Sequence, residues 1–272
     1  MRHVFFFVTF VMTMTVANSF CAQDFKVVAI DESGGRTMNA GTFASADPEA
    51  VKKYMPDGGA PASVSTIILF AGEDMVLFDT GLGSETWSKK LTESGVKFEN
   101  VKLILLTHFH GDHIGGLLQG DARRFPQAKV LASTQENESG APEKIKAAYG
   151  QDFTTFKFDD EVFANASVKV KALDAMGHTP GHSVFLIESK KESKERFLVI
   201  GDLLHAAALQ FPVPEACASF DRDKEKAIAA RKRILDFAAQ EKIPVGGMHL
   251  PPPSVGTVKK EGNGYSFELK NN

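Results

Sequence analysis

Four side chains of types that bind metal ions fall within six residues of this chain. His108, His110, Asp112 and His113 directly follow the apolar run 101–106. If that run is a strand, its extended end points the first two histidines the same way, because alternate side chains share a face. The glycine that follows permits a tight turn, so Asp112 and His113 can face a second ion about 3.5 Å from the first. Imidazole and carboxylate without thiolate suit zinc, and in some settings iron or manganese.

Further residues of these types occur far along the chain, each near the end of a short apolar run. Residues 177–182 contain two histidines, residues 201–202 end in an aspartate and residues 246–249 end in a histidine. Each signal alone is weak, and an aspartate such as Asp202 is often an ordinary turn residue. Loops at strand ends are nevertheless where α/β proteins place their sites. We therefore expect the four segments, which occur in this order, to meet in one metal site.

The remaining sequence alternates short apolar runs with polar helical stretches. Strands are predicted at 63–71, 75–78, 101–106, 128–133, 168–173, 183–188 and 197–200. The run 101–106 is apolar almost throughout, as in a strand buried on both faces, whereas 168–173 alternates with period two. Residues 221–241 form the clearest helix, with apolar residues at three- and four-residue spacing, and residues 85–95 form a second helix with a loop. This order predicts an α/β architecture of packed layers.

The N-terminus has the layout of a secretory signal peptide, which we predict over residues 1–22. Arg2 precedes an apolar run at 4–16, and small and polar residues follow it. Cleavage after Ser19 fits the small-x-small rule, and cleavage after Cys21 or Ala22 is an alternative; a buried strand or a membrane anchor is the other interpretation. The protein is therefore expected in the periplasm or outside the cell. No second apolar run reaches membrane length, so we expect no membrane association after cleavage.

The composition fits a single folded domain over residues 23–272. Of 272 residues, 43% are hydrophobic and 24% are charged, which provides a sizeable core and excludes a disordered chain. The net charge is −3, whereas a nucleic-acid-binding protein needs a basic surface. Two cysteines exclude a disulfide framework or a four-cysteine zinc site. We expect Cys217 to pack in the core and the partner to be a small-molecule substrate.

These motifs together resemble the metallo-β-lactamase superfamily. Its His-x-His-x-Asp-His signature matches residues 108–113, and its later elements match His182, Asp202 and His249. The resemblance covers residues 63–249. It implies a four-layer αβ/βα sandwich with the metals at one edge.

The resemblance also implies a ligand set for two divalent ions, which we expect to be zinc. It assigns His108, His110 and His182 to the first ion, Asp112, His113 and His249 to the second, and Asp202 to both as a bridge. In this family an aspartate such as Asp79 supports the metal loop by hydrogen bonding. His178 is expected to be structural and to tie down its turn.

The segment after Asp202 narrows the expected activity. Residues 201–211 resemble methyl parathion hydrolase-type proteins, whereas quorum-quenching lactonases have tyrosine where this chain has His205. True metallo-β-lactamases lack the bridging aspartate, so antibiotic hydrolysis is not expected. We predict a hydrolase of small esters, lactones or phosphotriesters, in which a hydroxide that bridges the metals attacks the substrate.

Asp112 and His205 are the candidate catalytic residues. Asp112 would help to orient the water, and His205 would hydrogen-bond the substrate or leaving group, unless it is only a wall residue. Phe109 and Phe211 are candidates to line an apolar substrate pocket, although Phe109 would instead pack inward if it points away from the metals. The sequence does not identify the pocket roof, for which residues 42–61 are the candidate segment.

Two alternative functions stay open. The first is an acyl-homoserine lactone lactonase, which substrate preference would distinguish from the methyl parathion hydrolase-like activity. The second is a metal-binding protein without catalysis, which the presence of all seven expected ligands disfavours. The resemblance also allows a homodimer.

Overall fold

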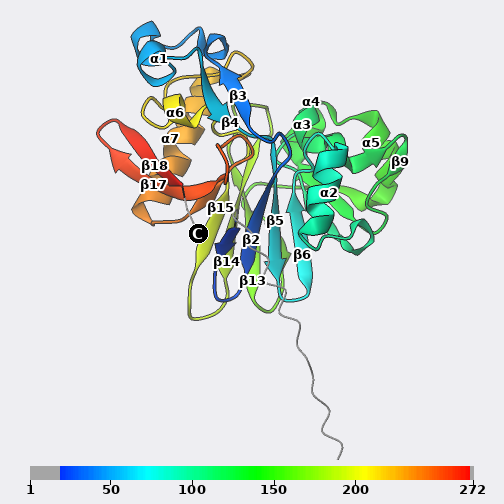
Figure 1. Ribbon diagram of the computed structural model, residues 1–272. Helices are drawn as coiled ribbons and strands as arrows, with labels where there is room; N and C mark the ends of the chain where they lie inside the picture. Colours follow the sequence, from blue (N-terminus) through cyan, green and yellow to red (C-terminus); the bar gives the residue numbers. More distant parts are fainter. Residues whose placement is uncertain (1–18, 270–272) are drawn as a thin grey trace, which may run out of the picture.

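Two large β-sheets form the centre of the computed structural model, which describes residues 19–269 (Figure 1). Among these residues each sheet has seven strands. The first sheet contains, in spatial order, β1 (Ser19–Cys21), β2 (Lys26–Asp31), β5 (Ser65–Ala71), β6 (Asp74–Phe78), β7 (Leu103–Leu105), β10 (Lys129–Ser133) and β11 (Phe153–Phe156). The second contains β12 (Glu161–Ala164), β13 (Val168–Asp174), β14 (Ser183–Ser189), β15 (Arg196–Val199), β16 (Val245–Gly246), β17 (Val255–Glu261) and β18 (Gly264–Leu269).

Shorter elements surround the two sheets. The α-helices of the described residues are α1 (Pro48–Tyr54), α2 (Glu85–Glu93), α3 (Gly111–Ile114), α4 (Thr134–Gly140), α5 (Glu143–Tyr149), α6 (Ala207–Gln210) and α7 (Lys224–Gln240). Short 3-10 turns occupy Ala40–Phe43, Phe98–Asn100, Gly115–Leu117 and Gly150–Asp152. Two small strand pairs stand apart from the sheets, namely β3 (Arg36–Asn39) with β4 (Gly59–Ala62) and β8 (Leu118–Gln119) with β9 (Ala122–Arg123).

Three apolar layers hold the sandwich together. The central layer lies between the sheets, where the rings of Phe78 and Phe185 approach to 5.3 Å between centroids. A second layer packs Trp87 of α2 against the outer face of the first sheet. The third packs Ile234 and Leu235 of α7 against the outer face of the second sheet. Helices thus cover both outer faces (Figure 1), which confirms the expected four-layer αβ/βα sandwich.

The predicted strands correspond closely to observed ones. The strand predicted at 101–106 is the shorter β7, whose Ile104 and Leu105 are buried in different apolar layers on opposite faces of the sheet. The alternating run at 168–173 is β13, whose valines face the central layer while its lysines are partly exposed. The strands predicted at 183–188 and 197–200 are β14 and β15, which pair antiparallel. Both hydrophobic periodicities therefore predicted which faces are buried.

The predicted helix at 221–241 begins later than expected. Asp223 is its N-cap, and its side chain accepts a hydrogen bond from the backbone N–H of Lys226, so α7 starts at Lys224. Asp221 therefore lies before the helix instead of in its first turn. This difference matters for the site, because Asp221 contacts one of the histidines described below.

The predicted signal peptide lies mainly outside the described residues, which begin at Ser19. The last part of the predicted segment forms β1, which pairs antiparallel with β2. Phe20 is buried there, with its ring 5.9 Å from that of Phe25 and 5.3 Å from that of Phe197. Secretion and the cleavage position stay predictions. Among residues 19–269, no helix is both long and apolar enough to cross a membrane.

The loops that carry the predicted ligands meet at one edge of the sandwich. The backbone N–H of Ser183, at the start of β14, donates to the carbonyl of Thr107 after β7, which joins the two sheets at this edge. β15 and β16 run parallel, so the segments that contain Asp202 and His249 leave the second sheet at the same end. The fold therefore brings together residues that are up to 141 positions apart in sequence, from His108 to His249.

Candidate metal centre

Six of the seven expected metal ligands gather at this edge. They are His108, His110, Asp112, His113, Asp202 and His249. The first two lie in the loop between β7 and α3, the next two in α3, and the last two in the loops that follow β15 and β16. The ligand atoms of these residues form two groups, and Asp202 contacts both.

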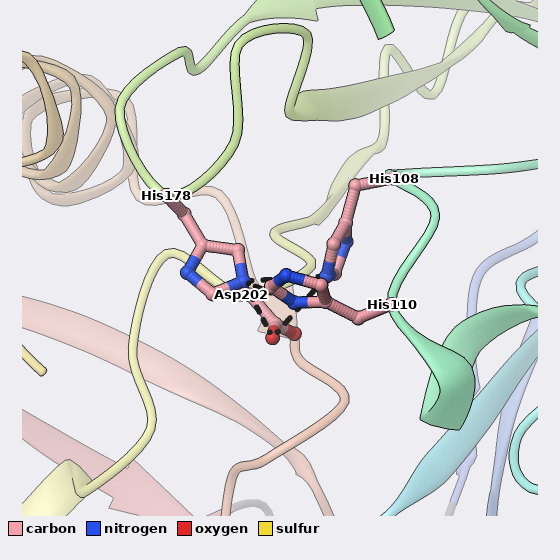
Figure 2. A group of neighbouring side chains, drawn as sticks. All are labelled: His108, His110, His178 and Asp202. Atoms are coloured by element: carbon pink, nitrogen blue, oxygen red, sulfur yellow. Dashed lines mark hydrogen bonds and ion pairs between the residues drawn. The ribbon is translucent and has the colours of Figure 1, made fainter. Parts of the chain in front are cut away.

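The first group consists of His108, His110, His178 and Asp202, whose ligand atoms all lie within 4.8 Å of one another. Nε2 of His178 is 3.3 Å from Nε2 of His108 and 3.0 Å from Nδ1 of His110. The same atom is 3.2 Å from Oδ2 of Asp202. Figure 2 shows the imidazoles of His108 and His110, which share one loop, converging with that of His178 and the carboxylate of Asp202 from other loops. Such a set of nitrogen and oxygen atoms is suited to one divalent ion.

The second group consists of Asp112, His113 and His249. Nε2 of His249 lies 3.5 Å from Oδ2 of Asp112 and 3.2 Å from Oδ2 of Asp202. Nε2 of His113 lies 3.1 Å from Oδ1 of Asp202. The Asp202 carboxylate thus stands between the two groups, with one oxygen beside His113 and the other beside His178 and His249. This position allows it to contact two ions at once.

The structure places His178, and not His182, among these ligand atoms. His182 uses both ring nitrogens within the protein: Nδ1 donates to the carbonyl of Ala175 at 3.0 Å, and Nε2 accepts from the N–H of Asp202 at 2.9 Å. Burial lowers the pKa of His182 to about 3, so the ring is neutral. At Gly201, a Cβ atom would lie 2.5 Å from Nε2 of His182, and φ is +52°, so glycine permits this contact. The geometry therefore exchanges the roles that we expected for the two histidines.

Two buried atoms of the cluster have no hydrogen-bond partner within the described part of the chain. They are Nε2 of His113 and Oδ1 of Asp202, which lie 3.1 Å apart as an ion pair but do not form a hydrogen bond with each other. Leaving buried polar atoms unpaired costs about 1–3 kcal/mol each, so native proteins rarely keep them without a ligand. A cation bound beside these atoms would satisfy both of them. The residues present therefore fit two divalent metal ions.

The charges within the cluster reinforce this interpretation. Burial alone would raise the pKa of Asp202, but His113 and His249 beside it hold that pKa well below its usual range. Burial alone would lower the pKa of His178, but hydrogen bonds to Asp202 and Asp221 raise it to about 9. In the metal-free cluster, a protonated imidazole such as that of His178 therefore supplies the positive charge beside the Asp202 carboxylate. A metal ion would replace such protons and leave the imidazoles neutral, as ligation requires.

Asp79 supports the metal loop as expected. Its Oδ2 lies 2.7 Å from Nδ1 of His113 and accepts from the Thr107 hydroxyl at 2.7 Å, and its Oδ1 accepts from the Thr107 N–H at 2.7 Å. Asp79 is fully buried and has a φ of 59°, a conformation that few non-glycine residues adopt. These contacts orient the ring of His113 so that Nε2 faces the metal position.

A corresponding contact orients His178 and was not predicted. Oδ1 of Asp221 lies 2.9 Å from Nδ1 of His178, and Oδ2 accepts from the N–H of Ala218. Arg231 is buried nearby, with its guanidinium 3.6 Å from the same carboxylate. Asp221 appears in the sequence only as an acidic residue near a helix start, so nothing in its local pattern indicated this partner.

A cavity of about 360 Å³ opens over the cluster. Its metal-site wall contains His110, Asp112, Asp202, His205 and His249. The rest of its wall contains Arg36, Thr37, Met38, Asn39, Thr42 and Phe220. The candidate roof segment 42–61 therefore contributes only its first residue, because β3 and the turn after it provide most of that wall. Both candidate catalytic residues line the cavity, and their roles stay predictions.

His205 lies between the metal cluster and the cavity. Its Nε2 is 3.1 Å from Oδ2 of Asp202, while its buried Nδ1 has no hydrogen-bond partner among residues 19–269. Burial lowers its pKa to about 4, so the ring is neutral. Its ring stacks on that of His249 at 5.2 Å and touches that of Phe220 at 4.7 Å. Because Nε2–H of this neutral ring donates to the Asp202 carboxylate, Nδ1 is the nitrogen left to accept a hydrogen bond from a bound molecule.

The two phenylalanines proposed for the pocket lie elsewhere. Phe109 packs outward against Phe153, with ring centroids 6.2 Å apart, in the apolar layer under the helices. Phe211 is buried and stacks on Phe267 at 4.7 Å in the layer beside α7. Phe220 is the aromatic residue of the cavity instead, and 41% of its surface is exposed. Being next to a motif did not predict the direction of these side chains.

Comparison with known proteins identifies relatives by sequence. The family model described as the metallo-beta-lactamase superfamily matches residues 59–246. A hydroxyacylglutathione hydrolase from Prochlorococcus marinus (strain NATL1A) is 38% identical over 106 residues, which is 39% of this chain and 37% of that protein. An atrochrysone carboxyl ACP thioesterase from Pseudocercospora fijiensis is 32% identical over 127 residues, which is 46% of this chain and 34% of that protein. The match thus spans about a third of the length of these curated relatives.

Solved structures match over nearly the whole chain. AidC, a dizinc quorum-quenching lactonase in complex with a product, superposes with a TM-score of 0.83 at 21% identity, covering 93% of this chain and 97% of AidC. The hydrolase AbOPH of the beta lactamase superfamily superposes with a TM-score of 0.80 at 26% identity, covering 93% of this chain and 98% of AbOPH. The first similarity concerns the fold alone.

Proposed function

This chain belongs to the metallo-β-lactamase superfamily, and we propose that it is a metal-dependent hydrolase. We infer that it holds two divalent ions and hydrolyses small esters, lactones or phosphotriesters. Zinc is the ion we expect. The observation that carries the proposal is the position of Asp202, whose carboxylate contacts both groups of ligand atoms. A carboxylate that reaches both groups is what a dinuclear centre needs from a shared ligand.

The ligand assignment follows from the observed groups. His108, His110 and His178 would hold the first ion, Asp112, His113 and His249 the second, and Asp202 would contact both. When bound, the ions would act as Lewis acids toward the substrate and would lower the pKa of a bound water to near neutrality. The protein's own contribution is to orient the imidazoles of His113 and His178 through Asp79 and Asp221.

Two residues of the cavity wall are assigned to the reaction. Asp112 is partly exposed to the cavity and can accept a hydrogen bond from water, which orients that water toward the substrate. His205 is neutral and donates from Nε2 to Asp202, so it would hydrogen-bond the substrate or leaving group by accepting at Nδ1. Phe220 offers an apolar surface beside His205 for an acyl or aryl group. None of these steps uses a serine or cysteine nucleophile.

The substrate class rests on two kinds of support. Residues 201–211 resemble methyl parathion hydrolase-type proteins, and Asp202 is the bridging residue that true metallo-β-lactamases lack. The second candidate activity, acyl-homoserine lactone hydrolysis, is supported by the overall similarity to AidC, a lactonase crystallised with N-hexanoyl-homoserine-type product. His205 replaces the tyrosine typical of those lactonases, so we rank the triester activity first.

A paired rate assay on the zinc-loaded protein tests these alternatives. One substrate is an aryl phosphotriester and the other an acyl-homoserine lactone. Asp202→Asn should abolish both activities, while Asp57→Asn, at an exposed carboxylate, should change neither. Faster lactone turnover would favour the second candidate. Turnover of neither substrate by a protein with two bound ions would refute both substrate classes, and Asp202→Asn with full activity would refute the dinuclear mechanism.

The cellular location is a further part of the proposal. Its support is the N-terminal pattern of Arg2 followed by the apolar run 4–16. Fractionation of the producing cells, with mass spectrometry of the mature N-terminus, tests it. A processed chain in the periplasm or medium is expected, and an unprocessed chain retained in the cytoplasm would contradict it. Light scattering of the same preparation would show whether the protein is a homodimer.

A further inference from the structure

Glu136 occupies an unusual position at the start of α4. Ser133 is the N-cap of this helix, and its hydroxyl accepts a hydrogen bond from the N–H of Glu136 at 3.0 Å. Serine followed three residues later by glutamate is the capping-box pattern, in which the glutamate side chain bonds back to the N-cap N–H. Ser133 is still part of β10, however, and pairs with Phe156 of β11. The Glu136 carboxylate points elsewhere.

The carboxylate of Glu136 accepts three hydrogen bonds from two distant loops. Its Oε1 accepts from the N–H of Phe109 at 3.1 Å. Its Oε2 accepts from the hydroxyl of Thr179 at 2.7 Å and from the N–H of Gly181 at 2.9 Å. The residue is only 3% exposed, and its partners are neutral donors, with no ion pair among the described residues. A buried carboxylate is costly unless such bonds stabilise it.

These three donors belong to the loops that carry the first ligand group. Phe109 stands between His108 and His110, and Thr179 follows His178. The loop of the first two histidines comes from the first sheet, and the turn of His178 joins β13 to β14 of the second. One side chain therefore connects ligands that the two sheets hold separately.

The contact between α4 and the turn is also very close. A Cβ atom on Gly181 would lie 2.1 Å from the backbone nitrogen of Glu136 and 2.4 Å from the hydroxyl oxygen of Ser133. The Ser133 hydroxyl donates to the carbonyl of Gly181 at 2.7 Å. Only glycine permits the turn to rest directly on the first turn of the helix. The close approach at Gly181 and the hydrogen bonds of Ser133 and Glu136 thus together set the distance between this turn and α4.

We propose that Glu136 is a positioning residue that sets the spacing between the two loops and thereby the affinity of the first metal position. It would act through Phe109, Thr179 and Gly181 and would not touch the ion. The second position depends on Asp79 and His113 instead, so it should be much less sensitive to Glu136. This inference rests on the proposed function only in requiring that the cluster binds metal.

The test compares Glu136→Gln with Glu138→Gln, a matched change at an exposed glutamate of the same helix. Glutamine keeps the size of the side chain, but one end of its amide is a donor and must face a donor N–H or hydroxyl. Metal-free protein is titrated with Zn²⁺ against a chromophoric chelator, and the visible spectrum of the Co²⁺ form reports ligand geometry. We expect one of the two ions to bind about 10–100-fold more weakly in Glu136→Gln. The Glu138 variant should match the wild type.

Several outcomes separate the possibilities. Two ions bound with wild-type affinity and an unchanged Co²⁺ spectrum would overturn the inference, as would equal weakening of both ions together with general loss of thermal stability. A wild-type protein that binds no ion would instead refute the proposed function. If Glu136→Gln does not fold, Thr179→Val removes one of the three donors with little change of shape. It should weaken the same ion by a smaller factor, and an unchanged affinity would again overturn the inference.

Discussion

The two ligand groups of the metal centre are supported in different ways. His113 is oriented by Asp79, which follows β6, and the strands β6 and β7 are direct neighbours in the first sheet. His178 belongs to the second sheet and must meet His108 and His110 of the first. Its support comes from Asp221 and Glu136, which lie outside both sheets. Neighbouring strands thus position the second group, whereas the first depends on contacts between separate layers.

The largest effect should come from replacing His178 in the turn 177–182 by alanine. His178→Ala removes a ligand of the first group, so bound zinc should fall from two ions to one. The rate constant kcat/KM should drop about 10³-fold, equivalent to about 4 kcal/mol. Metal analysis and the paired assay measure both quantities.

His182→Ala is the control for that experiment. It should keep two ions and lose about 1–3 kcal/mol of stability, because the Asp202 N–H and the Ala175 carbonyl lose their partner. If His182→Ala loses an ion and His178→Ala does not, the original assignment of His182 as ligand is restored and the comparison of the two groups fails.

A weaker effect is expected on the second group. Asp79→Asn replaces the carboxylate beside Nδ1 of His113, so we expect zinc at that position to bind about 10–100-fold more weakly. Chelator competition measures the affinity, with Asp57→Asn as the exposed control. In the double variant with Glu136→Gln, the two losses should fall on different ions. Losses on the same ion would show that the two groups do not have separate supports.

Removal of the metals should reverse the pH dependence of stability. In the metal-free protein, burial lowers the pKa of His178, but hydrogen bonds to Asp202 and Asp221 raise it from its usual 6.5 to about 9. This stabilisation is fully present below about pH 6.5 and disappears as the pH rises through about 9. The unfolding temperature of metal-free protein should therefore fall over this window.

His178→Gln should reduce that fall without abolishing it, because Asp202 and Asp79 also raise the pKa of His113 against the effect of burial. The zinc-loaded protein needs neutral imidazoles, so it should be stable at pH 9 and lose zinc toward acidic pH. A metal-free protein that gains stability between pH 6.5 and 9 would contradict this account of the cluster.

The smallest effect on function should come from a contact between the sheets far from the metals. Phe25→Ala removes a buried ring of the apolar layer between the sheets, within the predicted domain 23–272, which should lower the free energy of unfolding by about 3 kcal/mol. Zinc affinity and kcat/KM should not change. Gln23→Ala, at an exposed residue nearby, is the control. A change in metal affinity would show that general packing between the sheets, and not specific side chains, sets the ligand spacing.

Most ligands of this centre could be predicted from the sequence, and comparing the two ligand groups shows why the others could not. His108, His110, Asp112 and His113 form a local pattern after a recognisable buried strand, so their meeting required no knowledge of other layers. Asp202 and His249 end apolar runs and followed from the family resemblance. The layered fold was predictable for the same reason, since periodicity reports buried faces.

The remaining residues depend on contacts that no local pattern records. His178 and His182 are four residues apart in one Gly/Pro turn. The carbonyl of Ala175 and the N–H of Asp202 hydrogen-bond both ring nitrogens of His182, which leaves His178 as the ligand. The pattern Ser133-x-x-Glu136 predicts a cap, yet the carboxylate serves two other loops. Phe220 reaches the cavity because the chain before α7 lies over His205.

The wall formed by β3 and Phe220 has a consequence for how this enzyme can diversify. Arg36, Thr37 and Asn39 are exposed, line the cavity and contribute none of the metal ligands. Substitutions in β3 can therefore change the shape and charge of the cavity while every ligand loop stays intact. Selection for a new substrate, in nature or in a directed library, can act on these positions without first compensating for a damaged reaction centre.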